Sequence, residues 1–193
     1  MMVTDDGLLG GRDLIEVARA AERGGATSVQ LRLKLASARE QVQLARALVA
    51  ALRVPVLVND RPDVALAAGA AGVHLGSEDL PVALVRRIVP PGFVIGASVG
   101  SEAEAAGAVE ADYWGIGPWR VTATKQDAGE ALGAAGFGAL VRRAGGRPCL
   151  AIGAVRPEDV AAVRAAGGSG IAVVSGILAE QDIEAATRSY LVG

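Results

Sequence analysis

Charged and polar side chains recur in this sequence where short apolar runs end. Arg32 and Lys34 alternate with apolar residues, which puts both on the same face as Gln30. Positive charge combined with neutral hydrogen-bonding groups suits an anionic substrate such as a phosphate ester. The cations of this set are Arg32, Lys34 and Lys125, and its neutral groups are Asn59, Ser98, Thr122 and Thr124. Both lysines of the chain belong to the set, which predicts a phosphate site.

Two carboxylates also follow apolar runs. Asp60 stands directly after Asn59, and Asp79 ends a polar segment after the next run. Carboxylates placed together can hold Mg²⁺ that also takes phosphate oxygens of a substrate. Asp60 could instead cap a helix that starts at Pro62, because an aspartate accepts hydrogen bonds from the first free amides of a helix. The residues alone leave both interpretations of Asp60 open.

A second phosphate-binding region is expected after the last two apolar runs. Gly153 and the turn Val174-Ser175-Gly176 stand there, and backbone amides at such positions commonly bind phosphate. Two regions imply two phosphorylated substrates or one long substrate. His74 and Cys149 lie within apolar runs. We interpret Cys149 as a buried hydrophobic residue and His74 as a core residue or one that supports site residues from behind, and we leave His74 out of the catalytic set.

These residues must be positioned by the elements between which they stand. Short apolar runs alternate eight times with segments of helical period, which is typical of a parallel sheet with helical crossovers. The predicted strands span 1–4, 28–33, 54–58, 72–75, 93–97, 113–116, 149–152 and 170–174, and the predicted helices span 13–23, 38–52, 62–68, 81–89, 102–109, 137–144, 157–166 and 176–190. This pattern predicts a single compact (β/α)₈ TIM barrel over residues 1–193, with the active site at the carboxyl ends of the strands. A doubly wound open sheet is the less favoured alternative, because it usually has fewer units.

Composition excludes several classes of protein. A formal net charge of −2 argues against a surface for nucleic acid or anionic membranes. The longest stretch without a charged residue, 165–179, contains glycines and is shorter than the roughly 18 to 20 apolar residues of a membrane span. The single cysteine fits a reducing compartment, so we expect a cytoplasmic protein that acts on small molecules. The sequence leaves open whether it forms a homodimer.

Motifs in sequence order also carry a resemblance to one known family. They are QLRLK (30–34), VNDR (58–61), GVHLGSEDLP (72–81), GAS (96–98), GIGP (115–118), TATKQD (122–127), AIG (151–153) and VVS (173–175). Together they cover nearly the whole chain, and each resembles a segment of thiamine phosphate synthases.

The resemblance implies a barrel transferase. Such enzymes join 4-amino-5-hydroxymethyl-2-methylpyrimidine diphosphate to 4-methyl-5-(β-hydroxyethyl)thiazole phosphate; diphosphate leaves first, and the thiazole nitrogen captures the resulting methylene cation. By resemblance, Asp60 and Asp79 hold Mg²⁺, and Gln30 lies near the pyrimidine. The implied diphosphate-binding residues are Arg32, Lys34, Asn59, Ser98 and Lys125, of which all but Asn59 are also assigned as catalytic. The implied thiazole phosphate site consists of Thr122, Thr124 and the backbone at Gly153, Val174 and Ser175.

The sequence departs from the family pattern at a few positions. Gly100 stands where a histidine is frequent, Ala154 where a second glycine is usual, and Trp119 in place of a smaller residue. Two alternatives therefore stay open. One is a thiazole tautomerase of the same fold, whose acid or base in the sixth loop would fall at Pro118 here; the other is a non-catalytic protein that binds thiazole or thiamine phosphates. Whether residues 115–132 act as a lid does not follow from the sequence.

Overall fold

A computed structural model of the chain describes residues 1–121 and 130–191. It contains one sheet of eight parallel strands whose spatial order follows their order in the chain. The strands are β1 (Met2–Val3), β2 (Val29–Leu31), β3 (Val56–Asn59), β4 (Gly72–Leu75), β5 (Val94–Val99), β6 (Tyr113–Ile116), β7 (Cys149–Ala151) and β8 (Gly170–Ile171). The sheet closes on itself because Met2 forms a parallel bridge with Val173. The predicted barrel is therefore confirmed.

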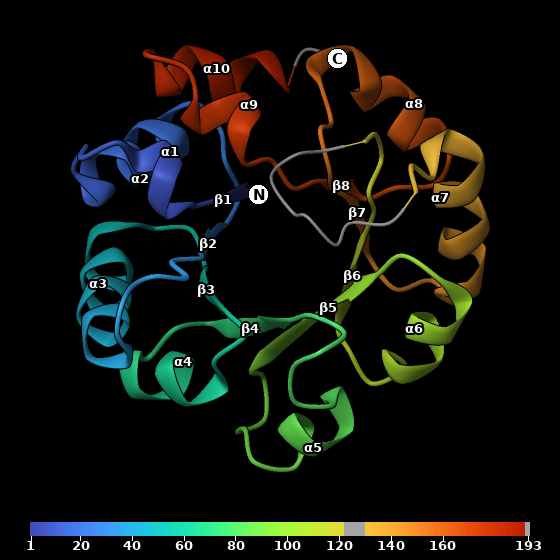
Figure 1. Cartoon of the computed structure of the whole chain (residues 1–193), viewed down its shortest axis with the longest axis horizontal. Coiled ribbons are helices and arrows are strands. Elements are labelled where there is room, and N and C mark those ends of the chain that lie inside the picture. The colour runs from blue at the N-terminus through green and yellow to red at the C-terminus, as the bar shows by residue number, and fades with distance from the viewer. Residues whose placement is uncertain (122–129, 192–193) are drawn as a thin grey trace.

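The helices form an outer ring around these strands, as the view along the barrel in Figure 1 shows. They are α1 (Asp6–Leu9), α2 (Leu14–Arg23), α3 (Ala38–Ala51), α4 (Pro62–Ala68), α5 (Val82–Arg86), α6 (Glu102–Gly107), α7 (Gly133–Arg143), η1 (Pro157–Asp159), α8 (Val160–Ala165), α9 (Ser175–Leu178) and α10 (Ile183–Ser189). Within the described ranges, none of them has both the length and the apolar character needed to cross a bilayer.

The largest differences between the helices and the predictions lie in three places. The single helix predicted over 176–190 is wrong: α9 ends at Leu178, and α10 starts after Asp182, whose carboxylate accepts a hydrogen bond from the Ala185 amide at 2.9 Å. Helix α7 begins at Gly133 rather than at Phe137. The one-turn helix α1 is absent from the prediction, and Asp5 caps it by accepting hydrogen bonds from two backbone amides.

The register of the strands shows which side chains face the surrounding helices and which face the inside of the barrel. Val58 pairs with Val73 and Val73 with Ile95, and these buried apolar side chains form part of the core cluster. Side chains alternate between the two faces of a strand, so their neighbours along each strand face the opposite way. Polar and small residues occupy that other face, namely Asn59, His74, Gly96, Ser98 and Gly115. The predicted polar residues of three strands thus share the inside of the barrel.

Candidate active site

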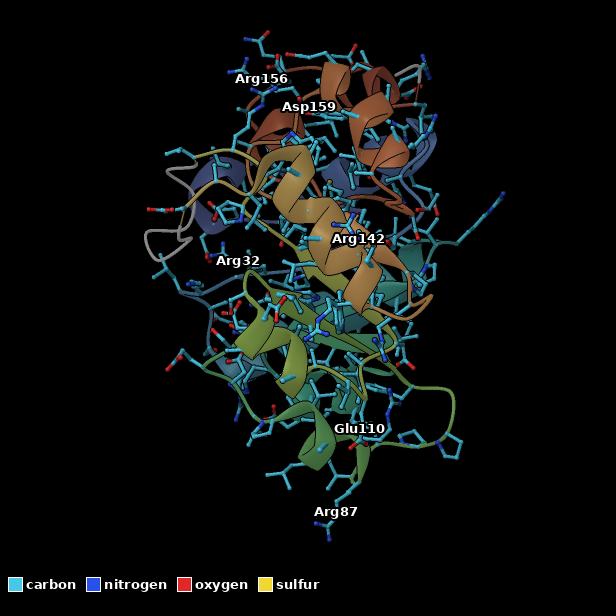
Figure 2. The ribbon with its side chains drawn as sticks, turned by 90° about the vertical axis from the view of Figure 1, so that its right-hand side faces the viewer. Arg32, Arg87, Glu110, Arg142, Arg156 and Asp159 are labelled. Atoms are coloured by element: carbon cyan, nitrogen blue, oxygen red, sulfur yellow. The ribbon has the colours of Figure 1, made fainter. Side chains whose placement is uncertain are left out.

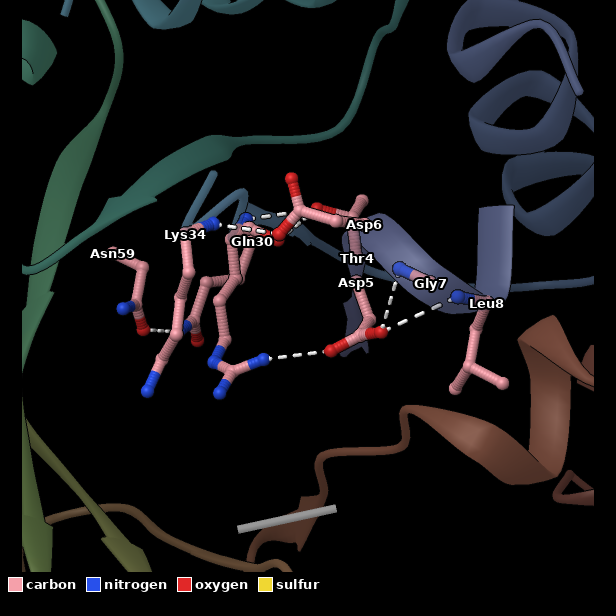
Figure 3. A network of polar contacts seen from close by, with 9 residues as sticks. Thr4, Asp5, Asp6, Gly7, Leu8, Gln30, Lys34 and Asn59 are labelled. Carbon is pink, nitrogen blue, oxygen red and sulfur yellow. Dashed lines mark hydrogen bonds and ion pairs between the residues drawn. The ribbon is translucent and has the colours of Figure 1, made fainter. Parts of the chain in front are cut away.

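The first part of the site lies where β1 and β2 end. Thr4 is fully buried, and its hydroxyl accepts a hydrogen bond from the Arg32 amide at 2.8 Å and donates to the Arg32 carbonyl at 3.2 Å. Asp5 accepts a hydrogen bond from Arg32 Nη1 at 2.9 Å, and Asp6 accepts one from the Lys34 amide at 2.7 Å (Figure 3). Three consecutive residues after β1 therefore hold the segment that carries Arg32 and Lys34, two of the three predicted cations.

Gln30 and Asn59 are hydrogen-bonded to each other beside this region. Gln30 Nε2 donates to Asn59 Oδ1 at 2.6 Å, and Gln30 is buried. In Figure 3 the side chains of Lys34, Gln30 and Asn59 extend to the same side of the network. Figure 2, which views the barrel from the side, shows Arg32 toward its left-hand end. Gln30 and Asn59 are thus in contact, and the hydrogen bond between their side chains fixes the orientation of both amides. Lys34 lies close enough for its charge to act on the neighbouring Asp60.

Asp60 and Asp79 are brought together as predicted. Burial, a hydrogen bond with Asp79 and the charge of that carboxylate raise the pKa of Asp60 to about 6, against the opposing charges of Lys34 and Arg32. Asp79 also accepts a hydrogen bond from the Gly76 amide at 2.6 Å. Two carboxyl groups that share a proton form a site where a divalent cation can replace that proton.

The helix-cap interpretation of Asp60 does not hold. The N-cap position of helix α4 is Arg61, whose side chain makes no capping hydrogen bond, and Asp60 lies one residue outside that position. Asp60 itself has a left-handed backbone with φ of 64°, a conformation that aspartate tolerates better than most residues. In the described part of the chain, no cluster of three or more His, Cys, Asp or Glu side chains is arranged to hold a metal. The acidic groups brought together here are the two carboxylates of Asp60 and Asp79.

A buried histidine connects Ser98 to Tyr113. His74 Nε2 lies 3.0 Å from Ser98 Oγ, and His74 Nδ1 lies 2.9 Å from the Tyr113 hydroxyl. Strand pairing explains this arrangement, since Gly96 lies between His74 and Tyr113 in the register. A Cβ at Gly96 would lie 2.1 Å from Tyr113 Cζ, so the glycine makes room for the tyrosine ring. His74 is thus a core residue, as we interpret it from the sequence, and one that contacts a predicted site residue.

The β7 end carries Gly153 and Ala154, and both have left-handed backbone conformations. Gly153 has φ of 95°, and a Cβ there would lie 2.7 Å from Pro118 Cα. Ala154 has φ of 50°, which explains physically why glycine suits this position. Its side chain is exposed. The departure at Ala154 therefore concerns backbone conformation as well as room for a ligand.

Trp119 and Arg120 anchor the chain after β6 to the region after β7. Trp119 is buried against Phe137, with ring centroids 5.5 Å apart, and its amide donates to the Ile152 carbonyl at 2.7 Å. The Arg120 amide donates to the Gly153 carbonyl at 3.0 Å, and its guanidinium pairs with the buried carboxylate of Asp159. Trp119, which replaces a smaller residue of the family pattern, is therefore packed in the core.

Val174 and Ser175 lie where β8 ends, beside the end of β7. Ser175 begins the short helix α9, and the Ala172 amide donates to the Ala151 carbonyl at 2.9 Å, which ties the two strand ends together. Gly153 and Ser175 thus follow neighbouring strands on the same side of the barrel. The other predicted residues of this region, Thr122 and Thr124, and the predicted cation Lys125 lie outside the described residues.

Sequence reasoning assigned no role to Thr4, Asp5, Asp6 or Tyr113. Thr4 and Asp5 do end the first apolar run, just as Asn59 and Asp60 end the third, but their contacts with Arg32 could not be read from that position. Asp6 lies one residue beyond that end, and Tyr113 begins its strand instead of ending it. Tyr113 reaches the site only because of the glycine on the neighbouring strand.

Comparisons with known proteins show the family to which the chain belongs. The family model described as thiamine monophosphate synthase matches residues 1–177. The chain belongs to this family. A thiamine-phosphate synthase of Methanoculleus marisnigri is 47% identical over 193 residues, covering 97% of this chain and 91% of that protein. One from Azorhizobium caulinodans is 46% identical with the same coverage.

Solved structures give the same result for the fold. Thiamine phosphate pyrophosphorylase from Pyrococcus furiosus superimposes with a TM-score of 0.87 at 35% identity, covering 99% of this chain and 93% of that one. A 3-hexulose-6-phosphate synthase superimposes with a TM-score of 0.67 at 17% identity and covers all of this chain and 99% of its own, a likeness of fold alone. The resemblance to thiamine phosphate synthases is therefore confirmed.

Proposed function

We propose that the chain is a thiamine-phosphate synthase, a transferase that joins the pyrimidine diphosphate to the thiazole phosphate and releases diphosphate. The observation that carries the proposal is the grouping of Arg32 and Lys34 with the paired carboxylates of Asp60 and Asp79, whose charges act on one another. Cations beside a carboxylate pair suit a diphosphate that arrives with a divalent metal. The family match over residues 1–177 supports the same activity.

The chemistry asks for charge neutralisation at the leaving group. When diphosphate departs, negative charge builds on the oxygen of the breaking C–O bond, and fixed cations and hydrogen-bond donors lower the energy of that state. Arg32, Lys34 and Lys125 supply the cations in this proposal, and Asn59 and Ser98 supply neutral hydrogen bonds. Gln30 faces the pyrimidine. The methylene cation then bonds to the thiazole nitrogen.

Tyr113 and His74 prepare Ser98 for this role. Burial raises the pKa of Tyr113, so its hydroxyl stays protonated and can donate to His74 Nδ1. Nε2 then carries the imidazole hydrogen and donates a hydrogen bond to Ser98 Oγ. The serine hydroxyl hydrogen is left to point toward an oxygen of the diphosphate.

Magnesium fits the residues of the site. Asp60 and Asp79 offer carboxylate oxygens, the ligands that Mg²⁺ prefers, and their shared hydrogen bond marks a place where positive charge is favoured. We propose that these two residues hold the ion. When bound, Mg²⁺ neutralises charge on the diphosphate oxygens.

The thiazole phosphate is proposed to bind at the ends of β7 and β8. Backbone amides at Gly153, Val174 and Ser175 would bind its phosphate, together with the hydroxyls of Thr122 and Thr124. Gly153 and Ser175 follow adjacent strands, which supports one shared anion site. The substrates are thus two small molecules. A cytoplasmic location and a homodimer are further parts of the proposal; the single, buried Cys149 supports the former.

The tautomerase alternative has less support. That isomerisation needs a general acid or base near the sixth loop, and Pro118 has no titratable side chain. His74 has both ring nitrogens in hydrogen bonds, to Ser98 and Tyr113, and is buried. A non-catalytic binding protein would have no need for the carboxylate pair. The synthase therefore accounts for more of the site than either alternative.

Diphosphate release from the purified protein tests the proposal. Both substrates are supplied with and without Mg²⁺, and thiamine phosphate is measured in parallel. We expect release that requires both substrates and the metal, with thiamine phosphate formed in equal amount. Binding of thiazole phosphate without any release would contradict the proposal, and the thiazole carboxylate phosphate would then be tested for isomerisation. Light scattering on the same preparation tests for the homodimer.

A further inference from the structure

The carboxylate of Asp5 makes two kinds of hydrogen bond at the edge of the proposed diphosphate site. Its Oδ1 accepts hydrogen bonds from the Gly7 and Leu8 amides, at 3.1 and 3.3 Å, and so caps helix α1. Its Oδ2 accepts the bond from Arg32 Nη1 at 2.9 Å. The capping bonds fix the position of the carboxylate, and the carboxylate in turn fixes the direction of the guanidinium.

The neighbours of Asp5 act on the backbone and not on the Arg32 side chain. Thr4 bonds to the amide and carbonyl of Arg32, and Asp6 bonds to the amide of Lys34. Among the described residues, Asp5 is the one acceptor to which the Arg32 guanidinium is bonded. Asp5 therefore supplies the constraint on that side chain.

The negative charge of Asp5 opposes the binding of a diphosphate, so its presence here needs an explanation. A carboxylate close to a diphosphate site repels the ligand, so Asp5 weakens binding unless it brings a compensating gain. Arg32 and Asp5 are both mostly shielded, with side-chain exposures of 15% and 22%, so neither charge is fully screened by water. Orientation supplies the gain, because the bond occupies one of five guanidinium hydrogens and leaves the others for phosphate oxygens.

We propose that Asp5 is a positioning residue that orients Arg32 for binding the diphosphate group. The proposal rests on the proposed function, since it takes Arg32 as a ligand of the diphosphate. An arginine already held in place loses less conformational freedom on binding than a free one. Asp5 touches no substrate in this arrangement and acts through Arg32.

The test compares Asp5→Asn with Asp13→Asn. Asparagine caps helices about as well as aspartate, so each variant keeps its cap and loses a charge. Asp13 caps α2 with bonds from the Ile15 and Glu16 amides at 2.8 and 3.0 Å, which makes it a matched control. Binding of inorganic diphosphate with Mg²⁺ is measured by calorimetry, and KM and kcat are measured for both substrates.

We expect Asp5→Asn to weaken inorganic diphosphate binding by about 2- to 10-fold, the change that follows when one long side chain must be ordered on binding. KM for the pyrimidine diphosphate should rise similarly, while KM for the thiazole phosphate stays unchanged. Asp13→Asn should alter neither. In an Arg32→Ala background, Asp5→Asn should cause no further loss of diphosphate binding, because no guanidinium is left to orient, and removal of the repulsion should tighten binding slightly.

Other outcomes overturn the proposal. Tighter diphosphate binding by Asp5→Asn would mean that repulsion outweighs orientation, and unchanged binding would mean that Arg32 needs no support. An equal loss in the Arg32→Ala background would show that Asp5 acts elsewhere. If Asp5→Asn melts well below Asp13→Asn, Asp5→Ser, which also caps, takes its place. Failure of the wild-type protein to form thiamine phosphate would refute the proposed function, whereas the calorimetric comparison tests Asp5 separately.

Discussion

Gly153→Ala is the substitution whose cost can be worked out most directly from the structure. Gly153 has φ of 95°, and a left-handed backbone costs an L-residue roughly 1 to 2 kcal/mol. The new Cβ would also lie 2.7 Å from Pro118 Cα and 3.2 Å from the Trp119 amide nitrogen, both backbone atoms. Such overpacking typically costs about 1 to 3 kcal/mol. We expect the free energy of unfolding to fall by about 2 to 5 kcal/mol.

Gly69→Ala separates the two contributions. Gly69 has φ of 70° at the end of α4, but no atom of the described residues lies within 4 Å of the position that a Cβ would take there. This variant has the conformational cost alone, partly offset by the lower entropy of the unfolded chain, so a loss of about 1 kcal/mol is expected.

Urea unfolding of both variants and of the wild type measures the difference in the free energy of unfolding. KM for thiazole phosphate is measured for the same three proteins. The Gly153 variant should also bind thiazole phosphate more weakly, because the shift required of residues 118 and 119 alters the Gly153 backbone. Equal loss of stability in the two variants, with KM unchanged in both, would refute the reasoning about close approach at Gly153.

Four further predictions concern the same site. Ala154→Gly relieves the backbone at φ of 50° and should raise the free energy of unfolding by about 0.5 to 1 kcal/mol in urea; a lower value would show that Ala154 is unstrained. Tyr113→Phe removes the hydroxyl bonded to His74 and should lower the free energy of unfolding by about 1 to 3 kcal/mol. It should also lower kcat; an unchanged kcat would show that the hydrogen bonds from Tyr113 through His74 to Ser98 play no part in turnover. Asp60→Asn should raise the Mg²⁺ concentration for half-maximal activity at least about tenfold, since disturbing even groups behind a metal ligand costs that much; an unaltered titration would remove Asp60 from the metal site. Lys125→Ala should keep the fold and lose about 100-fold or more in kcat, and full turnover would exclude this lysine from the mechanism.

The barrel could be predicted because periodicity is a local property of the chain. Each strand of the structure falls within or close to a predicted apolar run, and the polar residues after those runs come from a rule about strand ends. The ends of the helices were harder to predict from the sequence. Residues 133–136 contain two glycines and resemble a loop, yet the Leu132 and Gly133 amides bond to the carbonyls of Pro118 and Trp119, which fixes the start of α7 there.

The site contacts that could not be predicted depend on neighbours distant in the chain. The bond from Arg32 to Asp5 joins two strand ends, and its presence depends on the direction in which a capped helix leaves β1. The contact between His74 and Tyr113 spans an intervening strand and requires Gly96 in register. The break between α9 and α10 could have been predicted, because Asp182 is a residue type that commonly caps the start of a helix.

Closure of the barrel through Val3 and Val173 has a consequence for synthesis on the ribosome. The Val3 amide donates to the Val173 carbonyl at 2.9 Å, so one edge of β1 finds its partner only after residue 173 has been made. At about 5 to 20 residues per second, that wait is roughly 10 to 35 s. An unpaired strand edge can pair with another nascent chain. Because β1 has only two residues, few backbone groups are open to such pairing while the last strand is awaited.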